Sequence, residues 1–218
     1  MTSGFPRPRN IFVSKSARIG WNALLGVPEE KSLEKCKLHQ STFNNKPVKI
    51  GKRTVIGCNV VIYEGVEVGN DVIIEDGVNI GPDSVIDAKT RICYSAIVCD
   101  GVSIGKNCVI AGFVCDEAVV ESGCRIFGAL LHEQSQPHRD WWQVHEAPPR
   151  IKPHCTIGWG ALVIGRISVG PYCYVMPGAI VRKSVPPKSI VCRNGEVVSA
   201  SAWRGKKLRK LITWWNRE

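Results

Sequence analysis

The sequence of 218 residues lacks several features that would place it in a common functional class. No stretch approaches the roughly 20 consecutive apolar residues of a membrane-spanning helix, and the start MTSGFPRPRN has no apolar run of the kind found in signal peptides. No CxxC pair, phosphate-binding P-loop or dinucleotide fingerprint occurs. We therefore expect a cytoplasmic protein without a zinc ribbon or a nucleotide-binding motif.

What the sequence does contain is a repeat with a period of six residues. An Ile or Val recurs at every sixth position from Ile50 to Ile110, and a small or β-branched residue stands four positions after each. This period matches neither the 3.6 residues of an α-helix nor the alternation of an isolated strand. Six-residue repeats rich in Val, Ile and Gly are typical of a parallel β-helix, in which each repeat buries its apolar face by stacking on the next.

The phase of the repeat predicts the domain organisation. The hexads fall into four blocks, which start at Val13, Ile50, Val120 and Ile151, and a slip at 116–119 ends the second block. Together they make twenty-one hexads, or about seven triangular coils. We therefore expect an all-β chain with a single β-helix domain.

The interruptions of the repeat predict where loops leave the coils. The phase is lost over residues 25–49 and again over 132–150, and we interpret both stretches as loop excursions from one domain over residues 1–200. A basic amphipathic helix is predicted for residues 201–218. Because the coils are generic, the excursions are where specific function is expected.

Ten cysteines raise the question of disulfides. Cys108, Cys124, Cys155 and Cys173 all occupy the small, inward position of a hexad, where a thiol acts as a compact hydrophobic group. We therefore predict reduced cysteines with a structural role.

Two segments of this sequence resemble hexapeptide-repeat acyltransferases and are similar to those of sugar O- and N-acetyltransferases. They are IGWGALVIGRISVGPYCYVMPGAIVRKSVPP at 157–187, which matches the terminal coils, and GALLHEQSQPHRDWW at 128–142, which matches the interrupting loop. The resemblance implies a left-handed β-helix, a homotrimer with active sites between neighbouring subunits, and a place in polysaccharide biosynthesis. It also implies acetyl-CoA or a related acyl-CoA as donor, with His132 as the catalytic base.

The chemistry of acyl transfer agrees with that assignment of His132. Transfer from a thioester to a hydroxyl or amine needs a base within reach of the acceptor proton, and imidazole is the side chain whose ordinary pKa lies nearest neutrality. His138 is the alternative base in the same loop. Glu133, Asp140 or Glu146 could orient the imidazole, and the sequence does not choose among them.

Candidate donor-binding residues lie in the final hexads. The backbone N–H groups of Trp159, Gly160 and Gly178 could hold the pantetheine arm, or one of them could receive the developing oxyanion, although the glycines also serve tight turning. The charges of Arg182 and Lys183 suit the phosphates of CoA. Direct attack requires no covalent enzyme intermediate, so no cysteine is assigned as a nucleophile, and no metal is expected.

The acceptor must be recognised by the loops. Trp141 and Trp142 could offer a flat apolar surface to a sugar ring, or one of them could pack the loop against a neighbouring subunit. The identity of the acceptor, the choice between O- and N-acylation and the length of the acyl chain stay open.

The formal net charge of +10 raises the question of anionic partners. In the segment 201–218, the apolar residues Leu208, Leu211, Ile212 and Trp215 follow helical spacing among five Lys and Arg residues between 204 and 210. Such a helix could make peripheral contact with an anionic membrane or simply pack on its own protein. Nucleic-acid binding is not expected, because no reading motif accompanies the charge.

Two other functional classes share this fold. A γ-class carbonic anhydrase binds zinc through three histidines on adjacent faces, but only His154 of the five histidines lies within a coil here. A non-catalytic β-helix scaffold would bind no acyl-CoA. We therefore favour an acyltransferase and keep the other two as alternatives.

Overall fold

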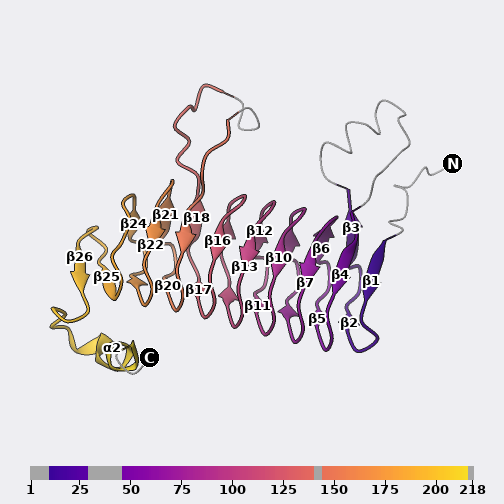
Figure 1. Cartoon of the computed structure of the whole chain (residues 1–218), viewed down its shortest axis with the longest axis horizontal. Coiled ribbons are helices and arrows are strands. Elements are labelled where there is room, and N and C mark those ends of the chain that lie inside the picture. The colour runs from indigo at the N-terminus through magenta and orange to yellow at the C-terminus, as the bar shows by residue number, and fades with distance from the viewer. Residues whose placement is uncertain (1–9, 29–45, 140–143, 216–218) are drawn as a thin grey trace.

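The computed structural model describes residues 10–28, 46–139 and 144–215. Over these residues the chain winds into a three-sided prism of parallel strands (Figure 1). The predicted left-handed parallel β-helix is confirmed, and the inward Ile and Val residues of successive coils lie directly above one another.

Each side of the prism is one sheet. The first sheet contains β1 (Ile11–Val13), β4 (Val48–Ile50), β7 (Glu67–Val68), β10 (Val85–Ile86), β13 (Ser103–Ile104), β16 (Val119–Val120), β19 (Arg150–Ile151) and β22 (Ser168–Val169). The second contains β2 (Arg18–Ile19), β5 (Val55–Ile56), β8 (Ile73–Ile74), β11 (Arg91–Ile92), β14 (Val109–Ile110), β17 (Arg125–Ile126), β20 (Thr156–Ile157), β23 (Tyr174–Val175), β25 (Ser189–Val191) and β26 (Val197–Ser199). The third contains β3 (Leu24–Val27), β6 (Val61–Tyr63), β9 (Asn79–Ile80), β12 (Ile97–Val98), β15 (Phe113–Val114), β18 (Ala129–Leu131), β21 (Leu162–Ile164) and β24 (Ile180–Val181).

The register of the sheets matches the predicted phase in the regular blocks. Ile50 pairs with Val68, Val68 with Ile86, and Ile86 with Ile104, and all four side chains are buried. One residue of each hexad therefore fills the bore, and the apolar area buried there is the main stabilising contribution.

The predicted number of coils is too low by one. In the described residues the first and third sheets each have eight strands, so there are eight coils and not about seven. The missing inward residues are Leu25, Val114 and Leu130, which pair with Ile62, Val98 and Val163. Strand β3 thus extends the first coil to Val27, inside the stretch interpreted as an excursion.

The sequence predicts a break in the six-residue period at 116–119, and this position is wrong. The inward residues Ile110 and Val114 are separated by a shortened turn at Gly112, and the next coil repeats the shortening at Gly128 between β17 and β18. A Cβ on Gly112 would overlap the carbonyl oxygen of Gly128. The turn at Gly112 can therefore stack on the turn at Gly128 only because residue 112 is glycine, and a Cβ on Gly128 would in turn overlap the carbonyl oxygen of Ala161 in the next coil.

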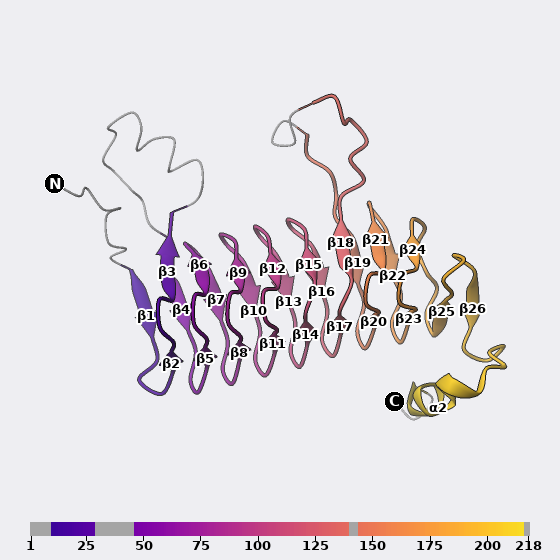
Figure 2. The same cartoon turned by 180° about the vertical axis from the view of Figure 1, so that it is seen from behind.

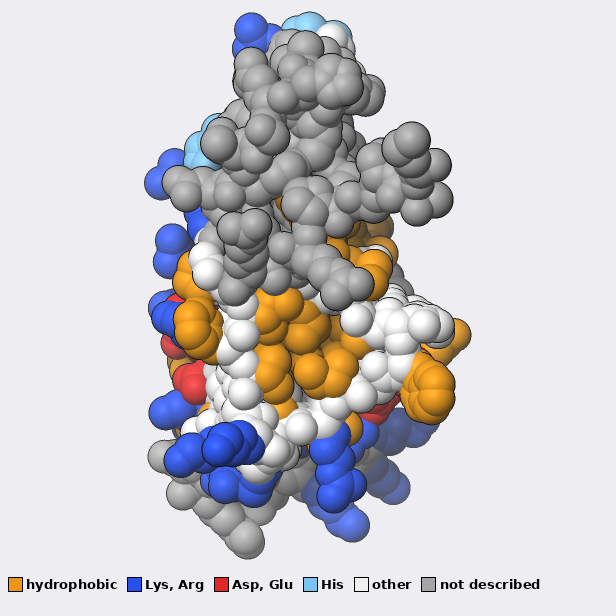
Figure 3. All heavy atoms as spheres, turned by 90° about the vertical axis from the view of Figure 1, so that its right-hand side faces the viewer, with side chains coloured by type: hydrophobic (Ala, Val, Ile, Leu, Met, Phe, Trp, Pro, Cys, Tyr) orange, Lys and Arg blue, Asp and Glu red, His pale blue; other side chains and the backbone are white. Residues whose placement is uncertain are grey.

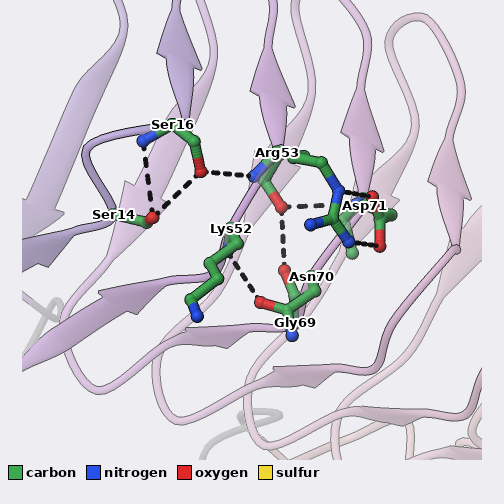
Figure 4. Close-up of polar contacts among 9 residues, drawn as sticks. Ser14, Ser16, Lys52, Arg53, Gly69, Asn70 and Asp71 are labelled. Atoms are coloured by element: carbon green, nitrogen blue, oxygen red, sulfur yellow. Dashed lines mark hydrogen bonds and ion pairs between the residues drawn. The ribbon is translucent and has the colours of Figure 1, made fainter.

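Polar side chains tie successive coils together at the corner between the first and second sheets (Figure 4). The backbone N–H of Arg53 donates to the Ser16 hydroxyl at 3.1 Å, and the N–H of Lys52 donates to the Asn70 side-chain oxygen at 2.7 Å. The Arg53 guanidinium makes two hydrogen bonds of 2.6 Å to Asp71. These contacts satisfy turn groups that the strands leave unpaired.

The four cysteines predicted to point inward are buried. Each thiol donates a hydrogen bond to a backbone carbonyl of the following coil, at 3.2 Å for Cys108, 3.1 Å for Cys124, 2.9 Å for Cys155 and 3.0 Å for Cys173. The hydroxyls of Thr54 and Thr90 make the same contact earlier in the prism, both at 2.8 Å. These stacked cysteine and threonine side chains therefore help to hold successive coils together.

The two ends of the prism differ. At the C-terminal end β26 runs antiparallel to β25, and a short 3-10 turn (Lys206–Leu208) leads into helix α2 (Arg209–Trp215), which packs on the last strands. At the N-terminal end the first coil leaves Phe12, Ile19 and Trp21 exposed. Figure 3 shows the apolar side chains gathered at the centre of that end.

Candidate functional site

His132 is the first residue after β18 of the third sheet, at the start of the loop that leads to β19. It follows β18, whose Leu130 is fully buried and whose Leu131 pairs with Ile164 of the next coil. The loop rises from this corner and returns at β19 (Figure 1). The backbone of His132 is therefore held by the rigid coil, while its side chain stays about one-quarter exposed.

A carboxylate lies beside the imidazole. The His132 Nε2 atom is 3.9 Å from Oδ2 of Asp116, which is longer than a hydrogen bond. The other carboxylate oxygen of Asp116 accepts the backbone N–H of Asp100 at 3.2 Å. His132 Nδ1 is buried and has no hydrogen-bond partner among the described residues. Asp116 can thus stabilise an imidazolium once His132 has taken up a proton.

Asp116 was not among the predicted orienting residues, although a signal for it exists. Strands β15 and β18 pair sixteen residues apart, because of the shortened turn. With that spacing Asp116 falls one coil below His132, as Asp100 does below Asp116. A break in the period at 116–119 would move Asp116 out of line with His132, so the sequence did not predict that the two residues are neighbours.

The three carboxylates proposed from the sequence have other positions. The Glu133 side chain lies against Gly165 of the next coil. Glu146 accepts hydrogen bonds of 2.6 Å from the backbone N–H groups of Gln134 and Ser135 and from the Ser135 hydroxyl. Asp140 lies outside the described residues. Glu146 therefore closes the loop.

The hydrogen bonds to Glu146 hold its pKa below its ordinary value. The Ser135 hydroxyl is the largest cause, followed by the two backbone N–H groups and the nearby His132. A second contact joins the return limb to the coil, since His145 Nε2 lies 3.8 Å from a Glu117 carboxylate oxygen. His138, the alternative base, is exposed in the outer part of the loop.

Buried thiols adjoin Asp116. Burial, together with the Asp116 charge, raises the pKa of Cys99 and that of Cys115 to about 12. Both groups are therefore protonated thiols near neutral pH and poor nucleophiles. This chemistry agrees with direct attack by an acceptor.

The structure divides the predicted donor residues between two corners. Arg182 and Lys183 directly follow β24, and the register of the third sheet puts Lys183 in line with His132, two coils further on. At roughly 4.8 Å per coil, their backbones are about 10 Å apart along the prism. Both basic side chains are exposed.

Trp159, Gly160 and Gly178 lie at the other end of the same strands. The Gly178 N–H already donates to the Trp159 carbonyl oxygen at 2.9 Å, so it is engaged within the fold. Trp159 is 62% exposed and stacks on Phe127 with a centroid distance of 5.2 Å. Trp141 and Trp142 lie outside the described residues. These candidates are not brought together with His132 in one chain.

A groove of about 970 Å³ runs along β1, β4, β7 and β10, in the first coils rather than in the coil of His132. Within residues 10–28, 46–139 and 144–215 no three side chains of His, Cys, Asp or Glu are grouped to hold a metal ion. None of the described helices is long and apolar enough to cross a membrane.

Two family models match the repeats. One is described as bacterial transferase hexapeptide (six repeats) and matches residues 47–82; the other, hexapeptide repeat of succinyl-transferase, matches residues 93–112. The predicted resemblance to the hexapeptide-repeat acyltransferase family is thereby confirmed. No curated protein matches the chain.

Solved structures with similar coils include three acyltransferases. The polySia-specific acetyltransferase NeuO is 15% identical, with 94% of this chain and 99% of that chain covered and a TM-score of 0.45. LpxA, a UDP-N-acetylglucosamine O-acyltransferase from Moraxella catarrhalis RH4, is also 15% identical, with 95% and 82% covered and a TM-score of 0.40. AntD, an N-acyltransferase from Bacillus cereus crystallised with dTDP and 3-hydroxybutyryl-CoA, is 17% identical, with 87% and 95% covered and a TM-score of 0.44.

Proposed function

We propose that this protein is an acyltransferase that moves an acetyl or similar acyl group from acyl-CoA to a hydroxyl or amine of a sugar-like acceptor. The observation that carries the proposal is the position of His132, at the rigid end of β18, with Asp116 one coil below and Lys183 in register two coils beyond. A cytoplasmic location, a homotrimeric assembly and a role in polysaccharide biosynthesis belong to the same proposal.

In this mechanism His132 acts as the general base. It removes the proton from the acceptor hydroxyl or amine while the acceptor oxygen or nitrogen attacks the thioester carbonyl carbon. The tetrahedral intermediate then collapses, the carbon–sulfur bond breaks, and the proton on His132 is available to the departing CoA thiolate. Asp116 stabilises the imidazolium during this cycle.

The donor is proposed to be held by charge at the same corner. CoA carries phosphate groups, and the exposed side chains of Arg182 and Lys183 are proposed to bind them. The backbone N–H groups of Trp159 and Gly160 are proposed to contact a donor held by a neighbouring subunit, because they lie at the opposite corner of the same chain.

The test is a comparison of two kinds of variant. His132→Ala is expected to lower turnover by roughly 10² to 10⁴ with little change in acyl-CoA affinity, because the imidazole acts on the acceptor proton. Arg182→Ala with Lys183→Ala should instead weaken acyl-CoA binding and change the chemical step less. Thermal shift with acetyl-CoA measures the binding, and a screen of amino and hydroxy sugars supplies the acceptor for turnover.

His138→Ala is the matched control, since it removes an exposed imidazole from the same loop. Full activity of His132→Ala together with loss in His138→Ala would reassign the base. Absence of any acyl-CoA binding by the wild-type protein would favour the non-catalytic scaffold.

A further inference from the structure

The apolar face of helix α2 packs against the last strands of the prism. Trp215 is 1% exposed, and it packs with Leu211 and Ile212 into a cluster around Ile190 of β25. The Lys188 ammonium donates a hydrogen bond of 3.2 Å to the carbonyl oxygen of Trp215. An amphipathic helix enters a bilayer through its apolar face, and here that face lies on the helix's own protein.

The opposite face of this segment is basic. Lys206, Lys207, Arg209 and Lys210 are all exposed. Among the described residues none of these four forms an ion pair with a carboxylate. Arg53 and Arg91 on the coils, by contrast, are each paired with an acidic side chain. Within the described residues, no carboxylate therefore compensates the positive charge of this segment, which can meet an external anion.

One aromatic side chain accompanies these charges. The Trp214 ring meets His154 edge-on at 5.6 Å and Tyr172 at 6.2 Å between centroids, yet it stays 39% exposed. A shallow hollow of about 350 Å³ is lined by Arg209, Lys210, Thr213 and Trp214. Trp is enriched where protein meets the headgroup layer of a membrane, and guanidinium, ammonium and hydroxyl groups donate well to phosphate oxygens.

We propose that this outward face, formed by Lys206, Lys207, Arg209, Lys210, Thr213 and Trp214, binds the surface of an anionic phospholipid bilayer. Binding is electrostatic, without insertion of the helix, because the apolar face stays on the coils. Each basic side chain near such a surface contributes about five-fold to partitioning. The exposed Trp214 favours a headgroup layer over a nucleic acid, for which the fold offers no reading element.

The location of the helix leaves the candidate active site free. Figures 1 and 2 place α2 at the edge of the prism opposite the edge from which the loop after β18 rises. A surface bound at α2 does not cover His132. The inference is independent of the proposed acyl transfer, which concerns the other edge.

The test is cosedimentation of the full chain with vesicles. We expect binding to vesicles of phosphatidylcholine mixed with phosphatidylglycerol, weak or no binding to phosphatidylcholine alone, and loss of binding as salt is raised. The quadruple variant Lys206→Glu, Lys207→Glu, Arg209→Glu and Lys210→Glu should lose more than 100-fold in partitioning. Trp214→Ala should weaken binding by a smaller factor.

The matched control reverses charge elsewhere on the molecule. Lys15→Glu, Arg18→Glu, Lys52→Glu and Lys106→Glu together change four exposed basic residues of the coils and should leave vesicle binding within a few-fold of wild type. Circular dichroism and sedimentation should show that both variants keep the fold, and turnover of a soluble acceptor should not change in either. Equal binding to neutral vesicles, equal losses in the two variants, or displacement of the vesicles by duplex DNA at equal charge would overturn the proposal.

Discussion

The interior thiols act as small side chains that also donate one hydrogen bond. Cys108, Cys124, Cys155 and Cys173 are at most 1% exposed, and each bonds to a carbonyl oxygen of the next coil. A thiol reagent must reach the sulfur atom, and the closed bore gives it no access to these four side chains.

We predict that these four thiols stay unmodified by iodoacetamide in the native protein and react after denaturation. Cys58 and Cys192 are partly exposed, so they serve as internal controls that should be labelled first. Peptide mapping by mass spectrometry would assign each site. Native labelling of Cys124 at the rate of Cys192 would show that the coils open far more readily than their burial implies.

The loop after β18 is the element whose shape decides the candidate site. It is tied by Glu146 to Gln134 and Ser135 and by His145 to Glu117. All these groups are polar and near solvent, so the tether is local and is not part of the apolar core. Its strength should therefore depend on pH and on single substitutions.

The pH dependence follows from the depressed pKa of Glu146. A carboxyl whose pKa is lower in the folded than in the unfolded chain adds stability above its ordinary value of 4.5, and this is lost as pH falls through the folded value. We therefore expect the Gln134 and Ser135 amides to be protected from hydrogen exchange at pH 7. Their protection should decrease in acid, where Glu146 takes up a proton and its hydrogen bonds open more often. Comparison with unstructured peptides at each pH separates this from the intrinsic chemistry.

Glu146→Gln should weaken the tether at neutral pH and abolish its dependence on acid, because the neutral amide is a weaker acceptor than a carboxylate and does not titrate. Glu133→Gln serves as the control, because it changes a neighbouring acid that makes no such bond to any residue the structure describes. If Glu146→Gln kept the protection of both amides, the loop would be held by other contacts. If the protection is lost instead, turnover by Glu146→Gln reports directly on whether loop order matters for the reaction.

At the scale of the whole molecule, flat faces and a site spread over two corners point to an assembly. Val85, Ile97 and Ile180 are exposed on the faces of the prism, and the candidate donor residues Trp159 and Gly160 lie away from His132 within one chain. In a trimer the corner of one prism can lie against the face of the next. Residues at different corners can then contribute to one site.

We predict a homotrimer in sedimentation, three times the 24.0 kDa of the chain, with activity that depends on assembly. Co-expression of a His132→Ala chain with a Gly160→Asp chain is the sharper test, because the two positions lie at opposite corners of one chain and a Cβ at Gly160 meets no neighbouring atom within its own chain. If two subunits share each site, mixed trimers should regain part of the activity that both parents lack. A monomer that turns over substrate at micromolar concentration would rule out a shared site.

The period of six residues was sufficient to predict the β-helix, its inward Ile and Val residues and its buried cysteines. Stacking on similar neighbours imposes the same requirement at every regular repeat, so the local sequence predicts the inward positions within the regular blocks. It did not predict Leu25, Val114 and Leu130, which lie where the period of six is interrupted. The position of His132 at the start of the loop could be predicted in the same way, because the loss of the repeat marks where the chain leaves the coil.

Only the tertiary structure decided which residues meet across coils. Asp116 lies below His132 because two glycine turns shorten their coils together, and the close approach of Gly112 to Gly128 becomes evident only when the coils are stacked. The direction in which α2 faces was likewise open in the sequence, since an amphipathic pattern states that one face is buried but not against what. The cluster of Ile190, Leu211 and Trp215 settled it, because burying that face on β25 leaves the basic side chains outward.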